Sequence, residues 1–223
     1  MKKSTLLILS VIFIGFSTNS QIRVACIGNS ITYGAGIEHR DSLSYPAQMQ
    51  RILGDKWEVK NFGVGGATLL RKGNKPYWKL SALTDAMSFN PNVVVIKLGT
   101  NDSKSFNWKY KDEYIPDYLS FIDTLQALPS HPKIILCLPS KAYGNNWQIS
   151  DSIIRVDIIP MLKQIAKQRK LKVINLFKTM SNHAELFPDN IHPNYLGAEL
   201  IAKKVAKKVK KFEREILRNK KRN

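Results

Sequence analysis

Short apolar runs alternate along this chain with longer segments in which apolar residues recur at helical spacing. The apolar runs predict five β-strands, at residues 22–27, 57–62, 93–98, 133–138 and 172–176. The segments between and after them predict helices, at residues 45–53, 80–88, 116–128, 152–167 and 196–217. Strands that alternate with helices form right-handed βαβ units, whose strands are parallel and whose helices cover both faces of the sheet. We therefore expect an α/β fold, a three-layer α/β/α sandwich around a five-stranded parallel sheet.

A proline lies inside the fourth predicted helix. Apolar residues at helical spacing make one side of this segment apolar, among them Ile154, Ile158 and Ile165. Because Pro160 lacks a backbone N–H and its ring crowds the preceding turn, we expect it to kink or restart the helix.

The first twenty residues differ from the rest of the chain. Two lysines precede an apolar run at residues 6–16, and small polar residues follow it. This order is typical of a secretory signal peptide, with cleavage before Gln21. The run is too short for a membrane-spanning helix, which needs about 20 apolar residues. We expect residues 1–20 to be a signal peptide and residues 21–223 to form one domain, exported to the periplasm or secreted, without a transmembrane segment.

The composition is that of a protein with one sizeable core, since 43% of the 223 residues are hydrophobic. The two cysteines, Cys26 and Cys137, each lie in an apolar run, which indicates small buried side chains. A disulfide between them would require neighbouring strands. No Cys/His cluster has the spacing of metal ligands, and no glycine run completes a phosphate- or dinucleotide-binding motif. The sequence therefore predicts neither a metal nor a cofactor.

The formal net charge is +18, and much of it is concentrated at the C-terminus. The last predicted helix is amphipathic, with one apolar side and another covered by lysine and arginine. The simplest interpretation is a solvated outer face on a helix that packs against the core. The alternative is contact with an anionic membrane surface, an acidic glycan or nucleic acid. Nucleic acid ranks last, because an exported protein seldom meets it, and we expect no nucleic-acid partner.

Polar motifs follow the predicted strands, where an open parallel sheet places its ligand site. Ser30 stands on a sharp turn just past the first strand, as a candidate nucleophile or as an ordinary turn residue. The glycine-rich segment 61–68 follows the second strand and either directs backbone N–H groups at an anion or is a simple turn. Asn101 follows the third strand and either directs its amide into the same space or caps the next turn.

A histidine with an acidic partner follows the fifth strand. Asp189 and His192 are three residues apart, so both side chains of one tight turn point the same way. The carboxylate can then hold the Nδ1–H group of the imidazole and leave Nε2 to accept the Ser30 proton. We expect these groups to meet at one edge of the sheet.

Aromatic residues are frequent in the predicted loops, beside side-chain amides that could bind sugar hydroxyls. Trp108 follows the third strand, and Tyr143 and Trp147 follow the fourth. They suit sugar faces, and packing of the loops themselves is an equal alternative. Arg71 lies close in sequence to the glycine-rich segment and could meet an acidic sugar, although solvated surface charge is the simpler interpretation.

Four short blocks together resemble the SGNH (GDSL-type) hydrolases. They are G-N-S-I-T at 28–32, N-F-G-V-G-G at 61–66, G-T-N-D at 99–102 and D-N-I-H at 189–192. Each block is common alone, whereas the combination is specific. The resemblance implies a flavodoxin-like α/β/α sandwich and the hydrolysis of acyl esters without a metal or cofactor.

The resemblance also implies a role for each matching residue. Ser30 is the expected nucleophile, His192 the base and Asp189 the carboxylate that orients it. The expected oxyanion hole consists of the Ser30 N–H, the Asn101 side chain and a glycine N–H. Counting from the start of the second block favours Gly66 for that glycine, with Gly63 and Gly65 as alternatives. Asn29 departs from the family, whose name records aspartate at this position.

The expected activity is the removal of small acyl groups, mainly acetyl, from carbohydrates. The segments K-L-G-T-N-D at 97–102 and P-Y-W at 76–78 resemble carbohydrate-esterase members of the family. Two alternatives remain open. One is a lysophospholipase or acyl-thioesterase of the same family, and the other is a non-catalytic protein that binds glycans or anionic surfaces.

Overall fold

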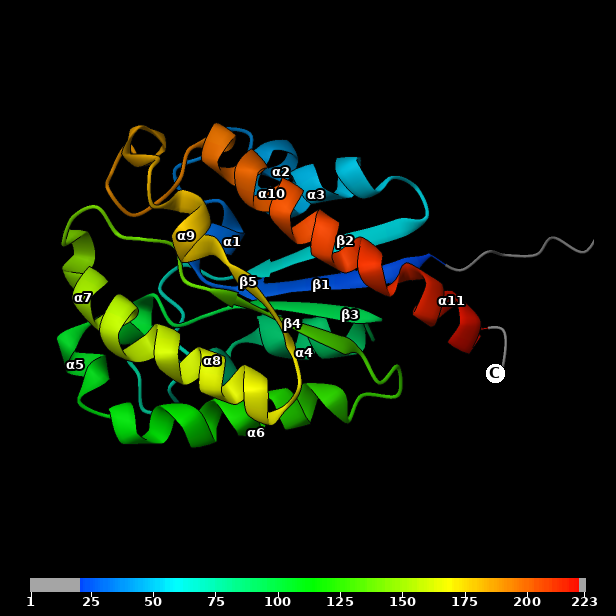
Figure 1. Cartoon of the computed structure of the whole chain (residues 1–223), viewed down its shortest axis with the longest axis horizontal. Coiled ribbons are helices and arrows are strands. Elements are labelled where there is room, and N and C mark those ends of the chain that lie inside the picture. Colours follow the sequence, from blue (N-terminus) through cyan, green and yellow to red (C-terminus); the bar gives the residue numbers. More distant parts are fainter. Residues whose placement is uncertain (1–20, 221–223) are drawn as a thin grey trace, which may run out of the picture.

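The computed structural model describes residues 21–220, so the predicted signal peptide lies outside the described residues. One sheet contains β1 (Ile22–Gly28), β2 (Trp57–Gly63), β3 (Val93–Lys97), β4 (Lys133–Leu138) and β5 (Lys172–Asn175). The strands are parallel and run in the order β2-β1-β3-β4-β5 (Figure 1). This is the flavodoxin-like order, and each strand begins and ends within one residue of its predicted position.

Helices cover both faces of the sheet (Figure 1). One face is covered by α3 (Tyr45–Leu53), α10 (Tyr195–Val209) and α11 (Glu213–Lys220), and the other by α4 (Ser81–Ser88), α6 (Tyr114–Gln126) and α8 (Ile159–Gln168). Shorter helices lie in the connections: α1 (Ser30–Tyr33), α2 (Arg40–Leu43), α5 (Ser105–Trp108), α7 (Asp151–Ile153) and α9 (Leu176–Met180). The predicted three-layer sandwich is confirmed.

The core is divided by the sheet into two clusters. On β1, Val24 and Cys26 point into the cluster beneath α3 and α10, whereas Ala25 and Ile27 point into the cluster beneath α6 and α8. Successive strand side chains point to opposite faces, and both faces are covered here, so the strand must be apolar throughout. This explains why the inner strands β1, β3 and β4 are almost continuously apolar, whereas the edge strands β2 and β5 contain more polar residues.

The proline of the fourth predicted helix is accommodated without a break. A π-helical turn at Ile154–Ile158 joins α7 to α8, and Pro160 is the second residue of α8. The Ile159 N–H donates to the carbonyl of Ile154, a bond that spans one residue more than in an α-helix. In place of the predicted kink there is a widened turn. Pro160 lies in the first turn of α8, where the lack of a backbone N–H costs little.

The C-terminal helix is split into α10 and α11 by a 3₁₀ turn at Lys210–Phe212. Its apolar side is buried at Ile201, Val205, Val209 and Ile216. The helix therefore packs against the core and turns its cationic side outward, in agreement with the simpler interpretation of its charge.

The two cysteines are free and fully buried. They lie on β1 and β4, which β3 separates, so the strands that carry Cys26 and Cys137 are not neighbours. No helix within residues 21–220 is long and apolar enough to cross a membrane.

Candidate active site

The candidate nucleophile begins the short helix α1, directly after β1. The side-chain oxygen of Asn29 accepts the Ile31 N–H at 3.1 Å and so caps this helix. A Cβ atom on Gly28 would lie 2.1 Å from the Thr32 hydroxyl oxygen, so only glycine fits the tight turn before it. These contacts hold Ser30 at the carboxyl edge of the sheet, partly exposed.

Ser30, His192 and Asp189 form one hydrogen-bonded chain. Ser30 Oγ lies 2.8 Å from His192 Nε2, and His192 Nδ1 lies 2.7 Å from Asp189 Oδ2. Since an ionised carboxylate only accepts hydrogen bonds, it fixes the proton on Nδ1 and leaves Nε2 to accept the Ser30 proton. The structure brings together the three residues that the sequence predicted at this edge.

The Asp189 carboxylate is held by the turn on which it lies. Its Oδ1 accepts the backbone N–H groups of Ile191, at 2.9 Å, and His192, at 2.6 Å. Partial burial alone would raise the pKa of this carboxyl, but these two bonds and the bond from the His192 ring together lower it. Asn146 adds a bond from its side-chain amide to the Asp189 carbonyl, at 2.6 Å. The carboxylate thus stays ionised and can stabilise a protonated imidazole.

The two other predicted oxyanion donors, Asn101 and Gly66, lie in the segments after β3 and β2. Asn101 donates its side-chain amide to the Ala67 carbonyl at 3.1 Å, which places it against the turn containing Gly66. Gly66 has φ +78, a left-handed conformation, and Val64 donates to the Gly28 carbonyl at 3.0 Å. The Gly66 N–H donates no hydrogen bond to any group within residues 21–220. The glycine-rich segment is therefore fixed against the nucleophile turn, with this donor unused.

One predicted substrate contact, Trp147, lies beside His192. The Trp147 ring is 5.0 Å from the His192 ring, centroid to centroid, in an edge arrangement. The side chain is 56% exposed and its backbone is left-handed, with φ 52. An exposed indole at this position can contact a bound molecule and the His192 ring at the same time.

The other three predicted contacts are engaged within the protein. The Tyr143 hydroxyl donates to the Met180 carbonyl and accepts the His183 N–H at 3.0 Å. Trp108 is only 7% exposed, and its indole N–H donates to Asp157 at 2.9 Å. The guanidinium carbon of Arg71 lies 3.4 Å from the centroid of the Trp78 ring, and Arg71 Nε lies 3.3 Å from Asp117 Oδ1. Trp108 thus follows the loop-packing alternative.

No group of three or more histidine, cysteine, aspartate or glutamate side chains in the described part of the chain is arranged to hold a metal ion. The model of the GDSL-like lipase/acylhydrolase family matches residues 26–200, which contain Ser30, Asn101, Asp189 and His192. The chain belongs to this family.

Relatives of this GDSL-like chain include carbohydrate esterases. A protein named acetylxylan esterase, from Xylanibacter ruminicola, is 45% identical over 207 residues, which cover 85% of this chain and 43% of that protein. The chain therefore spans less than half the length of this relative.

Solved structures share the fold of this family member. A carbohydrate acetylesterase from Sinorhizobium meliloti has a TM-score of 0.72 at 18% identity, over 86% of this chain and 100% of that chain. An acetyl xylan esterase has a TM-score of 0.66 at 25% identity, over 84% of this chain and 100% of that chain.

Asp102 belongs to the third of the four family blocks, and the sequence did not predict its structural role. It is fully buried, and its Oδ1 accepts the N–H groups of Leu69, at 2.9 Å, and Leu70, at 2.8 Å. Burial raises its pKa to about 6, although these hydrogen bonds act in the opposite direction. Asp102 thereby ties the turn that carries Asn101 to the chain just after the glycine-rich segment. Its place beside Asn101 in the motif was the only signal in the sequence.

Proposed function

We propose that this protein is an exported serine esterase that removes small acyl groups, mainly acetyl, from carbohydrates. The observation that carries the proposal is the hydrogen-bonded chain from Ser30 through His192 to Asp189. The 45% identity to a protein named acetylxylan esterase supports the substrate class. The exposed Trp147 ring beside His192 supports contact with a sugar face.

The first half of the reaction transfers the acyl group to the protein. Ser30 Oγ attacks the ester carbonyl carbon while His192 Nε2 takes the hydroxyl proton. The carbonyl oxygen becomes negative and accepts hydrogen bonds from the Ser30 N–H, the Gly66 N–H and the Asn101 amide. The intermediate then breaks its bond to the alcohol oxygen, which leaves with the proton from His192. The acyl group remains esterified to Ser30.

The second half returns the protein to its starting state. His192 Nε2 takes a proton from water as the water oxygen attacks the acyl carbon, and a second oxyanion forms in the same place. The bond to Ser30 Oγ breaks, the serine recovers a proton from His192, and the carboxylic acid leaves. Asp189 stabilises the protonated imidazole in both halves, because its lowered pKa keeps it ionised.

We also propose export and contact with an anionic surface. Export rests on the signal-peptide pattern of residues 1–20. Surface contact rests on the cationic outer side of α10 and α11, whose apolar side is occupied by the core.

Labelling with a fluorophosphonate tests the nucleophile. We expect one adduct, on Ser30, and a loss of at least about 10⁴-fold in kcat for Ser30→Ala, because the remaining donors cannot replace the nucleophile. Ser81→Ala is the matched control, since Ser81 is exposed at the start of α4, which follows β2. A protein that is folded but takes up no label would support the non-catalytic glycan-binding alternative.

A substrate panel tests the acyl group and its carrier. Initial rates are compared for acetylated xylan fragments, acetylated monosaccharides and p-nitrophenyl esters of increasing chain length. We expect the acetylated sugars and the acetyl ester to react fastest. Faster cleavage of long-chain esters or thioesters would favour the lysophospholipase or acyl-thioesterase alternative.

A further inference from the structure

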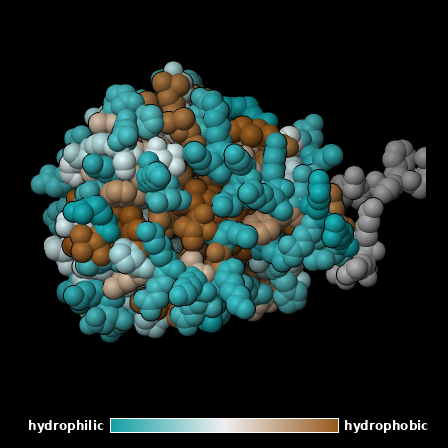
Figure 2. Space-filling view, viewed as in Figure 1, coloured by the Kyte–Doolittle hydropathy of each residue, from teal (hydrophilic) through white to brown (hydrophobic). Residues whose placement is uncertain are grey.

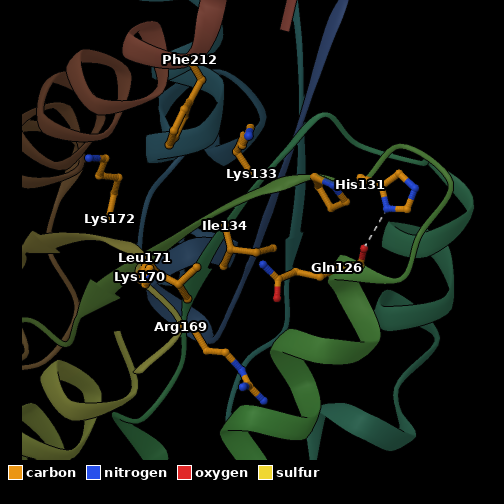
Figure 3. A pocket seen from close by; sticks show the side chains of 10 residues that line it. Gln126, His131, Lys133, Ile134, Arg169, Lys170, Leu171, Lys172 and Phe212 are labelled. Carbon is orange, nitrogen blue, oxygen red and sulfur yellow. Dashed lines mark hydrogen bonds between the residues drawn. The ribbon is translucent and has the colours of Figure 1, made fainter. Parts of the chain in front are cut away.

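Two hollows follow one another along the edge strand β5. The first, of about 320 Å³, is lined by Leu171 and Lys172 at the start of the strand, and by Lys133 and Phe212. Figure 3 shows the side chains of Lys133 and Lys172 on either side of the Phe212 ring. The second, of about 460 Å³, continues along Val173, Ile174 and Asn175 toward α9 and α10. Their linings meet in sequence at Lys172 and Val173, and the two hollows together are called the β5 groove here.

The β5 groove is lined by cations and by no acidic residue. The first hollow contains Lys133, Arg169, Lys170 and Lys172, and the second contains Lys178, Lys204, Lys207, Lys208 and Lys211. Lys133 pairs with Glu215, and Arg169 pairs with Asp123. The five lysines of the second hollow form no ion pair within residues 21–220. Like charges so close together repel one another, and an anionic ligand would relieve that repulsion.

The lysines of α10 form a row along one side of the helix. Lys207 and Lys208 lie three and four residues after Lys204, and Lys211, in the 3₁₀ turn that follows α10, lies seven residues after it, so all four line the same hollow. Protection of an open sheet edge accounts for a lysine on β5 itself, such as Lys172. It does not account for the row on α10, because these lysines lie outside the strand.

The floor of the groove suits a sugar chain. Val173 and Phe212 are partly buried and contribute apolar surface, and Figure 2 shows apolar surface in the middle of this face, surrounded by hydrophilic side chains. Strand β5 pairs with β4 alone, so its outer edge offers backbone donors and acceptors. A carboxylated sugar chain presents apolar ring faces, hydroxyl groups and negative charges, which match these three features. An anionic membrane could bind the lysines through their charge, but it would leave the apolar floor and the open strand edge of the groove unused.

We propose that the β5 groove binds a polysaccharide that carries carboxylate groups. This inference rests on the proposed function in one respect, namely that the same polymer carries the esters that Ser30 cleaves. The groove opens at Asn175 and Lys178, at the carboxyl edge of the sheet, where Ser30 also lies. In the sheet order β5 is three strands from β1, or about 14 Å at the usual strand spacing. In this proposal the polymer continues from the groove along the carboxyl edge of the sheet to Ser30.

Binding to polygalacturonate, which carries no ester, tests the proposal independently of catalysis. The Ser30→Ala protein is titrated with polygalacturonate and, in parallel, with a neutral arabinoxylan of similar length. We expect binding to polygalacturonate alone, and its affinity to fall as salt is raised, because exposed ion pairs are screened. Equal binding to both polymers, or to neither, would overturn the inference.

A pair of lysine variants tests the location. Lys204→Gln with Lys208→Gln should weaken polygalacturonate binding about fivefold, since two exposed ion pairs are lost. The matched control replaces Lys163 and Lys167, a pair of exposed lysines with the same spacing on α8 that does not line the groove, and should bind as before. An equal effect of both pairs, or tighter binding to anionic phospholipid vesicles than to polygalacturonate, would contradict the proposal.

Hydrolysis of p-nitrophenyl acetate separates the two proposals. The groove variants should hydrolyse it at the rate of the wild-type protein, because they lie outside the catalytic chain. A wild-type protein without this activity would contradict the proposed function. The polygalacturonate titration would still test the groove proposal on its own.

Discussion

The Ser30 hydroxyl meets His192 because residues on both sides of it fix the local backbone. Asn29 caps α1 through its side-chain oxygen, a bond that aspartate would also provide. The replacement of the family's aspartate therefore preserves the geometry of the turn and removes one negative charge. Asn29 is fully buried, and its Nδ2 atom has no partner within residues 21–220.

Asn101→Ala should reduce kcat by about 10²–10³-fold and leave the fold intact. The oxyanion would lose one donor, whereas the protein would lose only the bond to the Ala67 carbonyl. Steady-state kinetics with p-nitrophenyl acetate and thermal unfolding measure the two effects. Asn92→Ala is the matched control, because its side chain also bonds the backbone, at Arg23, but at the opposite end of β3. A similar loss of kcat in both variants would contradict the assignment.

Individual residues of the site were predicted unequally well. Ser30, Asp189 and His192 could be assigned because each follows a strand, and a parallel sheet brings these positions to one edge. The burial of Trp108 depends on Asp157, far along the chain, and no local pattern records that contact. The position of Trp147 depends on a left-handed backbone conformation. A tryptophan rarely adopts that conformation, so the sequence did not indicate it.

At the scale of elements, Asp102 joins the segment after β2 to the turn after β3. Its pKa is raised from 3.8 to about 6, so the folded protein binds this proton more tightly than the unfolded chain. Stability from this group is greatest below pH 4 and falls as the pH rises toward 6. The buried charge that then forms is tolerated because it accepts two backbone N–H groups.

Asp102→Asn should remove this pH dependence. Asparagine keeps an acceptor for the Leu69 and Leu70 N–H groups and does not ionise. Between pH 4 and pH 7 the wild-type protein should lose about 2 kcal/mol of unfolding free energy relative to the variant. Urea unfolding of both proteins across this range measures the difference. A difference that does not change with pH would show that Asp102 titrates as an ordinary carboxyl.

The elements themselves were predicted closely, except at Pro160 and in the last helix, which a 3₁₀ turn divides into α10 and α11. The first long helix, Tyr45–Leu53, was predicted at both ends, and Gly54 follows it in a conformation with positive φ. Pro160 correctly marked an irregular point, but the sequence could not show that a π turn would absorb it. That outcome depends on the packing of Ile154 and Ile158, the first and last residues of the turn, into the same core cluster.

At the scale of the whole molecule, the protein should leave the cytoplasm without its first twenty residues. Expression of the full chain in a bacterium with an intact secretion system should yield a mature protein that begins at Gln21. Mass spectrometry of the exported fraction measures this. Recovery of the intact chain in the cytoplasm alone would contradict the proposed export.

The two thiols lie on inner strands of the sheet, so their reactivity reports how often the folded protein opens. Burial raises the pKa of Cys137 to about 12 and that of Cys26 further still, so neither is a thiolate near neutral pH. A small alkylating reagent should therefore modify both at the same slow rate, set by how often the fold opens. Rapid modification of one thiol would reveal a local opening of β1 or β4. Because both thiols are native, alkylation kinetics would then rank the stability of every variant described above without an engineered probe.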